Sequence, residues 1–225
     1  LELIPPMKHA NSISFIEFNS DGSLLLTSSR DHTSRVWDTE TAESFCPPLL
    51  HSYVIEKSFF MPDNCVLTVS GDRMIRNWKL QPHEFQKSNI IDASITNAFV
   101  LSHDGLSFLT GGTDGILRHW DAKTGRPLPT NIDHGSEITR ITMHTDDDRI
   151  ALGDAMGNTR IYRLSTQTPL SSVVRNASHG GDRFVSQLEF TPDGSQLLIV
   201  YAGSSAVLCN GITGESQFIL KQSRS

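Results

Sequence analysis

Histidine, serine and aspartate recur together along this sequence, and these three residue types form the catalytic triad of many hydrolases. His9, Ser29 and Asp31 make the first such set, and His51 and Asp72 belong to a second. A hydrolase needs one set, whereas a repeated structural unit needs a set in every repeat. The sequence also contains no Gly-x-Ser-x-Gly nucleophile elbow. The recurrence therefore favours a structural role over nucleophilic catalysis.

The large aromatic residues follow the same period. Trp37, Trp78, Trp120 and Tyr162 follow one another at intervals of 41, 42 and 42 residues, and a degraded fifth copy places Cys209 in the same position after 47 more. Six residues before these positions stand Asp31, Asp72, Asp114, Met156 and Gly203, and the histidines fourteen residues after Trp37 and Trp120 are His51 and His134. A fixed period of this length indicates an array of one repeated structural unit.

Each period contains short segments typical of β-strands. In the first repeat these are "ISFIEF" at 13–18, "LLLTSS" at 24–29 and "SRVWD" at 34–38, and Asp-Gly or Pro-Asp turns recur between such segments. A weaker fourth segment follows the aromatic residue, as in "RPLPTNI" at 126–132. Prolines mark this fourth segment as an edge strand, where a missing N–H is tolerated: Pro5, Pro6, Pro47, Pro48, Pro129 and Pro169.

Four antiparallel strands in each period predict a propeller blade. The chain resembles the WD-repeat β-propellers, on the strength of its Asp-x5-Trp-Asp endings, upstream histidines and Asp-Gly turns. The resemblance covers essentially all 225 residues and implies an all-β fold of five four-stranded antiparallel blades. Residues 1–225 are expected to form one propeller domain, with repeats at about 1–38, 39–79, 80–121, 122–163 and 164–210 and a final outer strand at 211–225.

The resemblance also implies a buried hydrogen-bond network in each blade, running from tryptophan to a serine or threonine, then to histidine and to the turn aspartate. Its members would be His9, Ser29, Asp31 and Trp37 in the first repeat, and His51, Ser70, Asp72 and Trp78 in the second. The third repeat keeps Asp114 and Trp120 and has Asp92 and Gly112 in the histidine and serine positions. The fourth repeat keeps His134, and the fifth keeps only His179. The later blades are therefore expected to rest on apolar packing and to be locally less stable.

Composition excludes several other classes of protein. The chain has 25 acidic residues against 19 lysines and arginines, a net charge of −6, which argues against a general nucleic-acid binder. The three cysteines are far apart and form no CxxC pair, so reduced thiols are expected rather than a zinc site or disulfides. The histidines form no HxH or HExxH pair, and we expect no metal and no cofactor. No apolar stretch approaches a membrane span, and no charged-then-apolar leader is visible.

Two features concern the limits of the propeller. The fifth repeat is longer, and its extra residues fall at 168–183, which predicts a surface loop. The segment "LELIPPMKH" has the pattern of a fourth strand, as does "ESQFILKQ" near the other end. With its non-Met start, the chain is expected to be most of a seven- or eight-bladed ring. The alternative is an open or self-associating five-bladed object with exposed apolar faces.

The sequence thus predicts a non-catalytic protein-interaction scaffold, expected in the cytoplasm or the nucleus. Its partners would be proteins or peptides and further propeller repeats in the same or another chain, with no specific nucleic acid and no membrane. Expected contact positions, just before a turn aspartate or early on the innermost strand, are Arg30, Ser14, Glu56, Asn97 and Thr139. The alternative is a regulatory or sensor module attached to a catalytic or signalling domain outside this chain.

Overall fold

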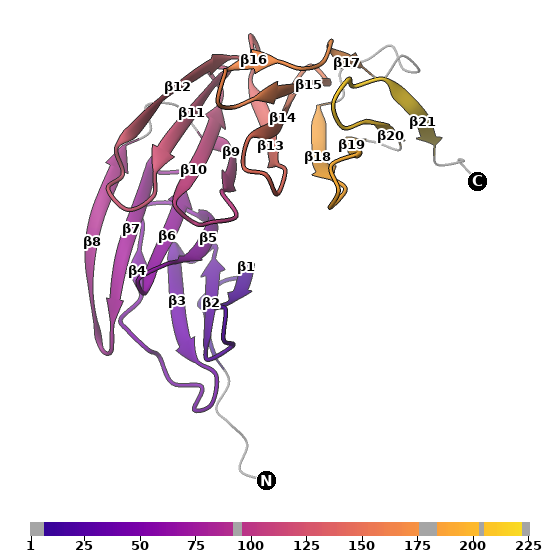
Figure 1. Cartoon of the computed structure of the whole chain (residues 1–225). Helices are drawn as coiled ribbons and strands as arrows, with labels where there is room; N and C mark the ends of the chain where they lie inside the picture. Colours follow the sequence, from indigo (N-terminus) through magenta and orange to yellow (C-terminus); the bar gives the residue numbers. More distant parts are fainter. Residues whose placement is uncertain (1–6, 92–95, 176–183, 203–204, 222–225) are drawn as a thin grey trace. The chain divides into compact units, whose positions relative to one another are not determined.

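The computed structural model of the chain describes residues 7–91, 96–175, 184–202 and 205–221. Within these ranges every extended regular element is a β-strand, and no helix occurs, as the short alternating segments predict. The strands form sheets of neighbours in sequence, all antiparallel (Figure 1). The chain divides into two compact units, Leu1–Ile95 with Lys123–Gly125 and Thr96–Ala122 with Arg126–Ser225.

The first unit holds two four-stranded sheets. The first sheet consists of β1 (Ile13–Phe18), β2 (Leu24–Ser29), β3 (Thr33–Asp38) and β4 (Leu49–Leu50). The second consists of β5 (Ile55–Met61), β6 (Cys65–Ser70), β7 (Met74–Gln81) and β8 (Glu84–Ile91).

The second unit holds three sheets. One consists of β9 (Thr96–Leu101), β10 (Ser107–Gly112), β11 (Ile116–Asp121) and β12 (Pro127–Asp133). The next consists of β13 (Ile138–Met143), β14 (Arg149–Asp154) and β15 (Asn158–Arg163), with the short β16 (Thr168–Pro169) and β17 (Val174–Arg175) both paired to β15. The last consists of β18 (Val185–Phe190), β19 (Gln196–Tyr201), β20 (Ser205–Asn210) and β21 (Ser216–Lys221).

The predicted turn chemistry lies where the first strand of a sheet meets the second. Gly22, Gly105 and Gly194, which end Asp-Gly pairs, all have positive φ values of 76°, 70° and 66°. Glycine adopts this conformation without a steric penalty, which is why the Asp-Gly pair fixes these hairpins. The predicted edge position is confirmed for β12, which contains Pro129 and pairs only with β11, whereas Pro47 and Pro48 precede β4.

Each predicted repeat after the first contributes to two sheets. The repeat at 39–79 supplies β4 to the first sheet and β5, β6 and most of β7 to the second. The segment "ESQFILKQ" likewise supplies β21, the fourth strand of the last sheet. In the segment "LELIPPMKH" the residues 1–6, with Pro5 and Pro6, lie outside the described residues, as do Asp92, 176–183 and Gly203.

Neighbouring sheets within a unit pack face to face. On each sheet, the forward face is the one that packs on the sheet following in sequence. The opposite face is the rear face. In the first unit, Leu26, Val36 and Leu49 of the first sheet share a buried core with Val66 and Trp78 of the second. The tryptophan therefore lies on the rear face of its own sheet.

The second unit repeats this packing twice. One buried core joins Leu109 and Ile132 of the β9–β12 sheet to Ile138 and Leu152 of the next. Another joins Ala151, Ile161 and Val174 to Val185, Leu197 and Val207 of the β18–β21 sheet. Since side chains alternate between the two faces of a strand, adjacent positions such as Ala151 and Leu152 serve different cores.

Candidate functional site

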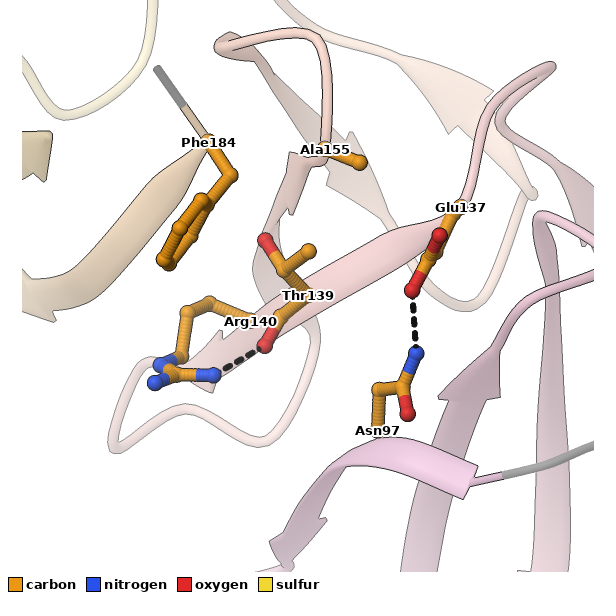
Figure 2. Close-up of a pocket in the computed structure, with 6 residues that line it drawn as sticks. All are labelled: Asn97, Glu137, Thr139, Arg140, Ala155 and Phe184. Carbon is orange, nitrogen blue, oxygen red and sulfur yellow. Dashed lines mark hydrogen bonds between the residues drawn. The ribbon is translucent and has the colours of Figure 1, made fainter. Parts of the chain in front are cut away.

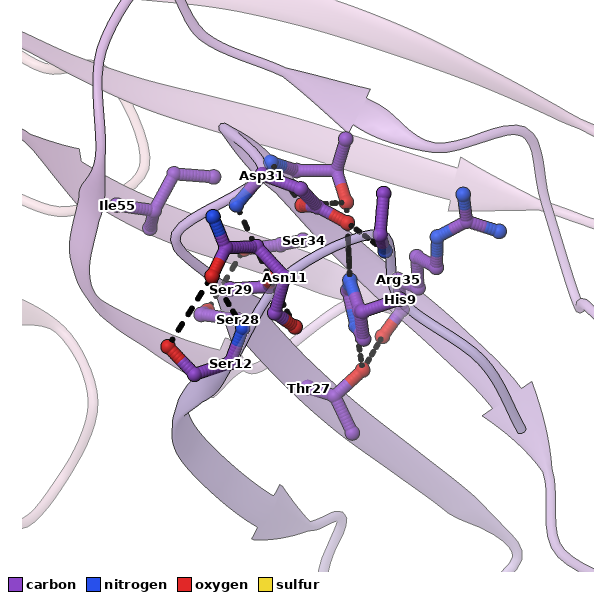
Figure 3. A network of polar contacts seen from close by, with 12 residues as sticks. His9, Asn11, Ser12, Thr27, Ser28, Ser29, Asp31, Ser34, Arg35 and Ile55 are labelled. Atoms are coloured by element: carbon purple, nitrogen blue, oxygen red, sulfur yellow. Dashed lines mark hydrogen bonds and ion pairs between the residues drawn. The ribbon is translucent and has the colours of Figure 1, made fainter. Parts of the chain in front are cut away.

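The first polar network lies on the rear face of the first sheet. The indole N–H of Trp37 donates to the hydroxyl oxygen of Thr27 at 2.8 Å, and His9 Nε2 lies 2.7 Å from the same oxygen. His9 Nδ1 lies 3.0 Å from Asp31 Oδ2 (Figure 3). Asp31 also accepts the hydroxyl of Thr33 at 2.7 Å. The aspartate, the histidine and the tryptophan are thus linked, as the sequence predicts.

Two members of this network fix the direction of their hydrogen bonds. A carboxylate only accepts, so Nδ1 of His9 donates to Asp31. An indole N–H only donates, so the Thr27 oxygen accepts it. Burial opposes ionisation of Asp31, but hydrogen bonds from Thr33 and Ala10 and from His9 hold the pKa of Asp31 below its usual range.

The hydroxyl in this network differs from the expected one. Sequence spacing places Ser29 between the indole and the imidazole, and that expectation is wrong, because Thr27 holds this position. Ser29 donates instead to the carbonyl oxygen of Asn11 at 3.1 Å and accepts the N–H of Asp31 at 3.1 Å. Ser29 therefore holds the turn that carries the aspartate.

The second sheet repeats the network with one addition. Trp78 donates to Thr68 at 2.8 Å, and His51 lies 2.6 Å from Thr68 and 3.1 Å from Asp72. Arg76 contacts His51 and donates to Asp72 at 2.8 Å. Burial, followed by the Arg76 guanidinium, lowers the pKa of His51 to about 4, so the imidazole is neutral near pH 7.

Ser70 plays the role of Ser29 in this second sheet. Its hydroxyl donates to the carbonyl oxygens of Tyr53 and Val54 at 3.2 and 3.0 Å, and it accepts the N–H of Asp72 at 3.3 Å. The expectation that Ser70 links tryptophan to histidine is wrong for the same reason. In both of these sheets the indole pairs with the threonine that lies two residues before the serine.

The third sheet keeps more of the network than the sequence indicates. Trp120 donates to Thr110 at 2.9 Å, so the indole has a hydroxyl partner although Gly112 occupies the expected serine position. Asp114 pairs with Arg118 at 2.5 Å. The expected histidine position, Asp92, lies outside the described residues.

The fourth sheet has a shortened network. The hydroxyl of Tyr162 lies 3.1 Å from Nδ1 of His134, with no threonine between them, and Leu152 takes the place of Thr27. Nε2 of His134 lies 3.7 Å from Asp154. Asp154 also accepts the N–H groups of Met156 and Asn158 at 2.9 and 2.7 Å. In the first two sheets this turn is held by an aspartate six residues before the tryptophan. Here Met156 stands at that position, and Asp154 holds the turn instead.

The Trp-Asp pair itself ends a strand and begins a turn. Asp38 Oδ1 accepts the N–H groups of Glu40 and Thr41 at 3.0 and 2.8 Å. Asn210 makes the same contacts with Ile212 and Thr213, at 2.9 Å each. The side chain after the aromatic position is therefore a turn cap.

Two of the expected contact residues join neighbouring sheets. Ser14, second on β1, donates to the carbonyl oxygens of Ser28 at 3.2 Å and Ile55 at 3.1 Å. Thr139, second on β13, lies 3.2 Å from the Gly153 oxygen and 2.8 Å from the Val185 oxygen. Both positions coincide with a register irregularity of the innermost strand.

The other expected contacts present their side chains more freely. Arg30 and Glu56 are exposed in the first unit, and Asn97 is exposed in the second. The Asn97 side-chain amide donates to Glu137 Oε1 at 2.6 Å.

A pocket of about 380 Å³ lies in the second unit at the beginnings of the innermost strands (Figure 2). We call it the Glu137 pocket, and its lining residues are Asn97, Glu137, Thr139, Arg140, Ala155 and Phe184. Its three sheets are tied together there, since the Asn97 side-chain amide donates to Glu137 Oε1 at 2.6 Å and the Thr139 hydroxyl lies 2.8 Å from the Val185 carbonyl oxygen.

Sequence reasoning finds Asn97 and Thr139 of this pocket and misses the rest. Ala155 directly precedes Met156, the turn position of the fourth repeat, just as Arg30 directly precedes Asp31 in the first. The rule that selects Arg30 as a contact position therefore also selects Ala155. Glu137 and Phe184 each directly precede an innermost strand. That position carries a different residue type in each repeat, and no sequence signal identifies it.

An apolar patch marks the rear face of the first sheet. Phe18 is 60% exposed, whereas Met143 and Phe190, which hold the same register position on β13 and β18, are 6% and 9% exposed. Ile16, on the same face as Phe18, is 61% exposed. Met143 and Phe190 are buried because a preceding sheet packs on them.

The forward face of the last sheet has a matching patch. Leu220 of β21 is 58% exposed, whereas its register equivalents Leu49, Ile132 and Val174 are 0%, 4% and 5% exposed. Glu189 lies on this face in the position that Glu17 holds on the first sheet. The Glu17 carboxylate accepts the backbone N–H of Phe60 on the next sheet at 3.0 Å.

In the described ranges, no group of three histidine, cysteine or acidic side chains could hold a metal ion. The same residues include no helix with the length and hydropathy needed to cross a bilayer. Asp146, from the acidic "TDDD" turn, accepts the N–H groups of Asp148 and Arg149 and pairs with the Arg149 guanidinium at 3.0 Å.

Comparison with known proteins points to one family. The model of the "WD domain, G-beta repeat" matches residues 6–38 and 85–121. Apoptotic protease-activating factor 1 is similar over most of the chain: the rat protein is 25% identical over 92% of this chain, and the human protein 26% over 93%. This chain spans 17% of the length of each.

Two further similarities agree with this. Eukaryotic translation initiation factor 3 subunit I of Phaeosphaeria nodorum is 27% identical over 73% of this chain and 55% of its own length. The crystal structure of the computationally designed Ika8 protein matches with a TM-score of 0.75 at 20% identity, over 94% of this chain and 62% of that one. The structural match supports the propeller-type fold of the sheets.

Proposed function

The chain belongs to the WD-repeat family, and we propose that it is a non-catalytic interaction module. Its unfilled sheet faces and the beginnings of its innermost strands contact other proteins or peptides. The histidine, hydroxyl and aspartate groups that could suggest catalysis are engaged with one another and with an indole. Their role is to hold the strands and turns that carry the contact surfaces.

The exposure of Phe18 carries this proposal. Its equivalents are buried by a neighbouring sheet, and large apolar patches left in water favour association. The occupant of the rear face of the first sheet and of the forward face of the last is a further four-stranded sheet of the same kind, in the same or another chain. Glu189 supports this choice, because Glu17 in the same position binds the backbone of the next sheet.

A second candidate is a regulatory module within a larger protein. The chain spans 17% of the length of apoptotic protease-activating factor 1, whose name describes the activation of a protease. In that arrangement the sheets would bind a partner, and a separate catalytic or signalling domain of the same polypeptide would respond to that binding. The two candidates share the same surfaces and differ in what else the polypeptide carries.

The cysteines support a location inside the cell, in the cytoplasm or the nucleus. Cys46, Cys65 and Cys209 all carry free thiols, and Cys46 and Cys209 are buried. Burial raises the pKa of each of these two thiols to about 11, which keeps them protonated and unreactive.

Sedimentation velocity tests the proposal with a second copy of the chain as the probe. We expect the weight-average sedimentation coefficient to rise with concentration up to about 100 µM, because the two unfilled faces are complementary. Phe18→Lys and Leu220→Lys should each suppress this rise, whereas Ser20→Lys, in an exposed turn, should not. A wild-type chain that remains monomeric over the whole range contradicts the proposal.

A further inference from the structure

We propose that the Glu137 pocket binds a lysine or arginine side chain of a partner peptide. This inference rests on the proposed function, and it names the chemistry that the partner presents. Most polar groups that line the pocket already bond to other groups of the protein, and one carboxylate oxygen is left for a ligand.

The Glu137 carboxylate is the acidic group of the pocket. Asn97 donates to its Oε1 at 2.6 Å, which orients the carboxylate and leaves Oε2 for another donor. Among the described residues, Glu137 takes part in no ion pair, and it is only partly exposed. A partly buried carboxylate with one neutral hydrogen-bond donor favours a cationic ligand.

The neighbouring polar groups are directed into the protein itself. The Thr139 hydroxyl lies within hydrogen-bond distance of the carbonyl oxygens of Gly153 and Val185. Arg140 donates through Nε to the Ser186 carbonyl oxygen and through Nη1 to the Thr139 carbonyl oxygen at 2.5 Å. The positive charge of Arg140 is therefore held along β13 and β18 rather than paired with Glu137.

The apolar lining selects a long side chain. Figure 2 shows Phe184 and Glu137 on opposite sides of Thr139, with Ala155 between them at the rim. Phe184 is 44% exposed, so its ring offers an apolar surface to a ligand. The methylene stem of a lysine or arginine would pack near Phe184 and Ala155 while its charged end reaches Glu137. A bare cation would leave this apolar wall unused.

The test is an NMR titration of the ¹⁵N-labelled chain with capped five-residue peptides. One peptide carries lysine between alanines, a second carries norleucine and a third glutamate in the same place. We expect the lysine peptide to shift the backbone amides of Ala155 and Phe184 and the side-chain amide of Asn97. Norleucine keeps the stem without the charge and should shift them much less. Equal responses to lysine and norleucine, or a stronger response to glutamate, overturn the proposal.

Substitution assigns the effect to the pocket. Glu137→Gln keeps an acceptor for Asn97 and removes the charge, and it should weaken binding of the lysine peptide about fivefold. Glu40→Gln, in an exposed turn of the first unit, should leave binding unchanged. Unchanged binding in Glu137→Gln, or an equal loss in Glu40→Gln, overturns the assignment.

These results are distinguishable from a failure of the proposed function. The peptide titration reads the Glu137 pocket alone, whereas self-association reads the faces that carry Phe18 and Leu220. A chain that self-associates without binding the lysine peptide would lose only this inference.

Discussion

The indole Nε1 of Trp78 and the hydroxyl of Thr68 lie 2.8 Å apart, and this pairing recurs between Trp120 and Thr110 at 2.9 Å. The hydroxyl links the tryptophan of the third strand to the histidine that precedes the innermost strand. In the first and the second sheet, one buried threonine thus joins distant parts of the sheet.

The first prediction concerns this threonine. Thr68→Val leaves the Trp78 indole and the His51 imidazole without their buried partner, so the free energy of unfolding should fall by about 1–3 kcal/mol. Urea denaturation measures the change. Thr168→Val, at an exposed position, should change stability by less than about 0.5 kcal/mol. Equal effects of the two substitutions would show that the hydroxyl contributes no buried hydrogen bond.

The second prediction concerns pH. The pKa of His51 is about 4 in the folded chain against 6.5 for an ordinary imidazole, so the unfolded chain binds this proton more tightly. Stability attributable to His51 should therefore be constant above pH 6.5 and fall as the pH drops from 6.5 toward 4. The fall should amount to about 1–3 kcal/mol.

Thermal denaturation across this pH range measures the effect, and His51→Gln is the comparison. Stability of the variant should depend less steeply on pH between 6.5 and 4 than that of the wild type. Parallel pH profiles for the two proteins would contradict the assignment of a neutral buried imidazole.

The third prediction concerns the close approach of neighbouring sheets in the second unit. A Cβ added at Gly153 would lie 2.5 Å from Val185 Cγ1, and one at Gly111 would lie 2.7 Å from Ile138 Cγ2. Gly153→Ala should therefore destabilise the chain by about 1–3 kcal/mol through overpacking. Urea denaturation measures the change. A Gly153→Ala chain as stable as the wild type would rule out this tight contact.

The fourth prediction ranks the sheets by local stability. The second sheet has the complete network of Trp78, Thr68, His51 and Asp72, whereas the last sheet places Cys209 opposite Leu197. Amide hydrogen exchange should therefore be slower in β6 than in β19. Exchange that is slower in β19 would mean that apolar packing outweighs the polar network.

The repeat period was enough to predict the fold and part of each network. Trp37 and Asp31 could be identified because they recur at fixed spacing. Thr27 could not, because Thr27 and Ser29 lie on the same face of β2 and spacing alone does not tell which is level with the indole. The register of β2 and β3, with Leu25 opposite Trp37, decides this.

The Glu137 pocket was predictable only in part, for a different reason. Asn97 and Thr139 lie at a position that recurs in every innermost strand. Glu137 and Phe184 lie at the preceding position, where the residue type changes from repeat to repeat. The pocket exists because three sheets bring these unlike residues together.

Disulfide trapping between two copies tests the central claim, that the unfilled faces receive further sheets of the same kind. Glu17 contacts the backbone of Phe60 across the interface between the first two sheets, and Glu189 and Phe18 hold the equivalent positions on the unfilled faces. In a Cys65→Ser background, a mixture of Phe18→Cys and Glu189→Cys chains should form a disulfide-linked dimer on mild oxidation. The yield should exceed that of a mixture of Ser20→Cys and Glu189→Cys chains. Equal yields from the two mixtures would contradict the claim.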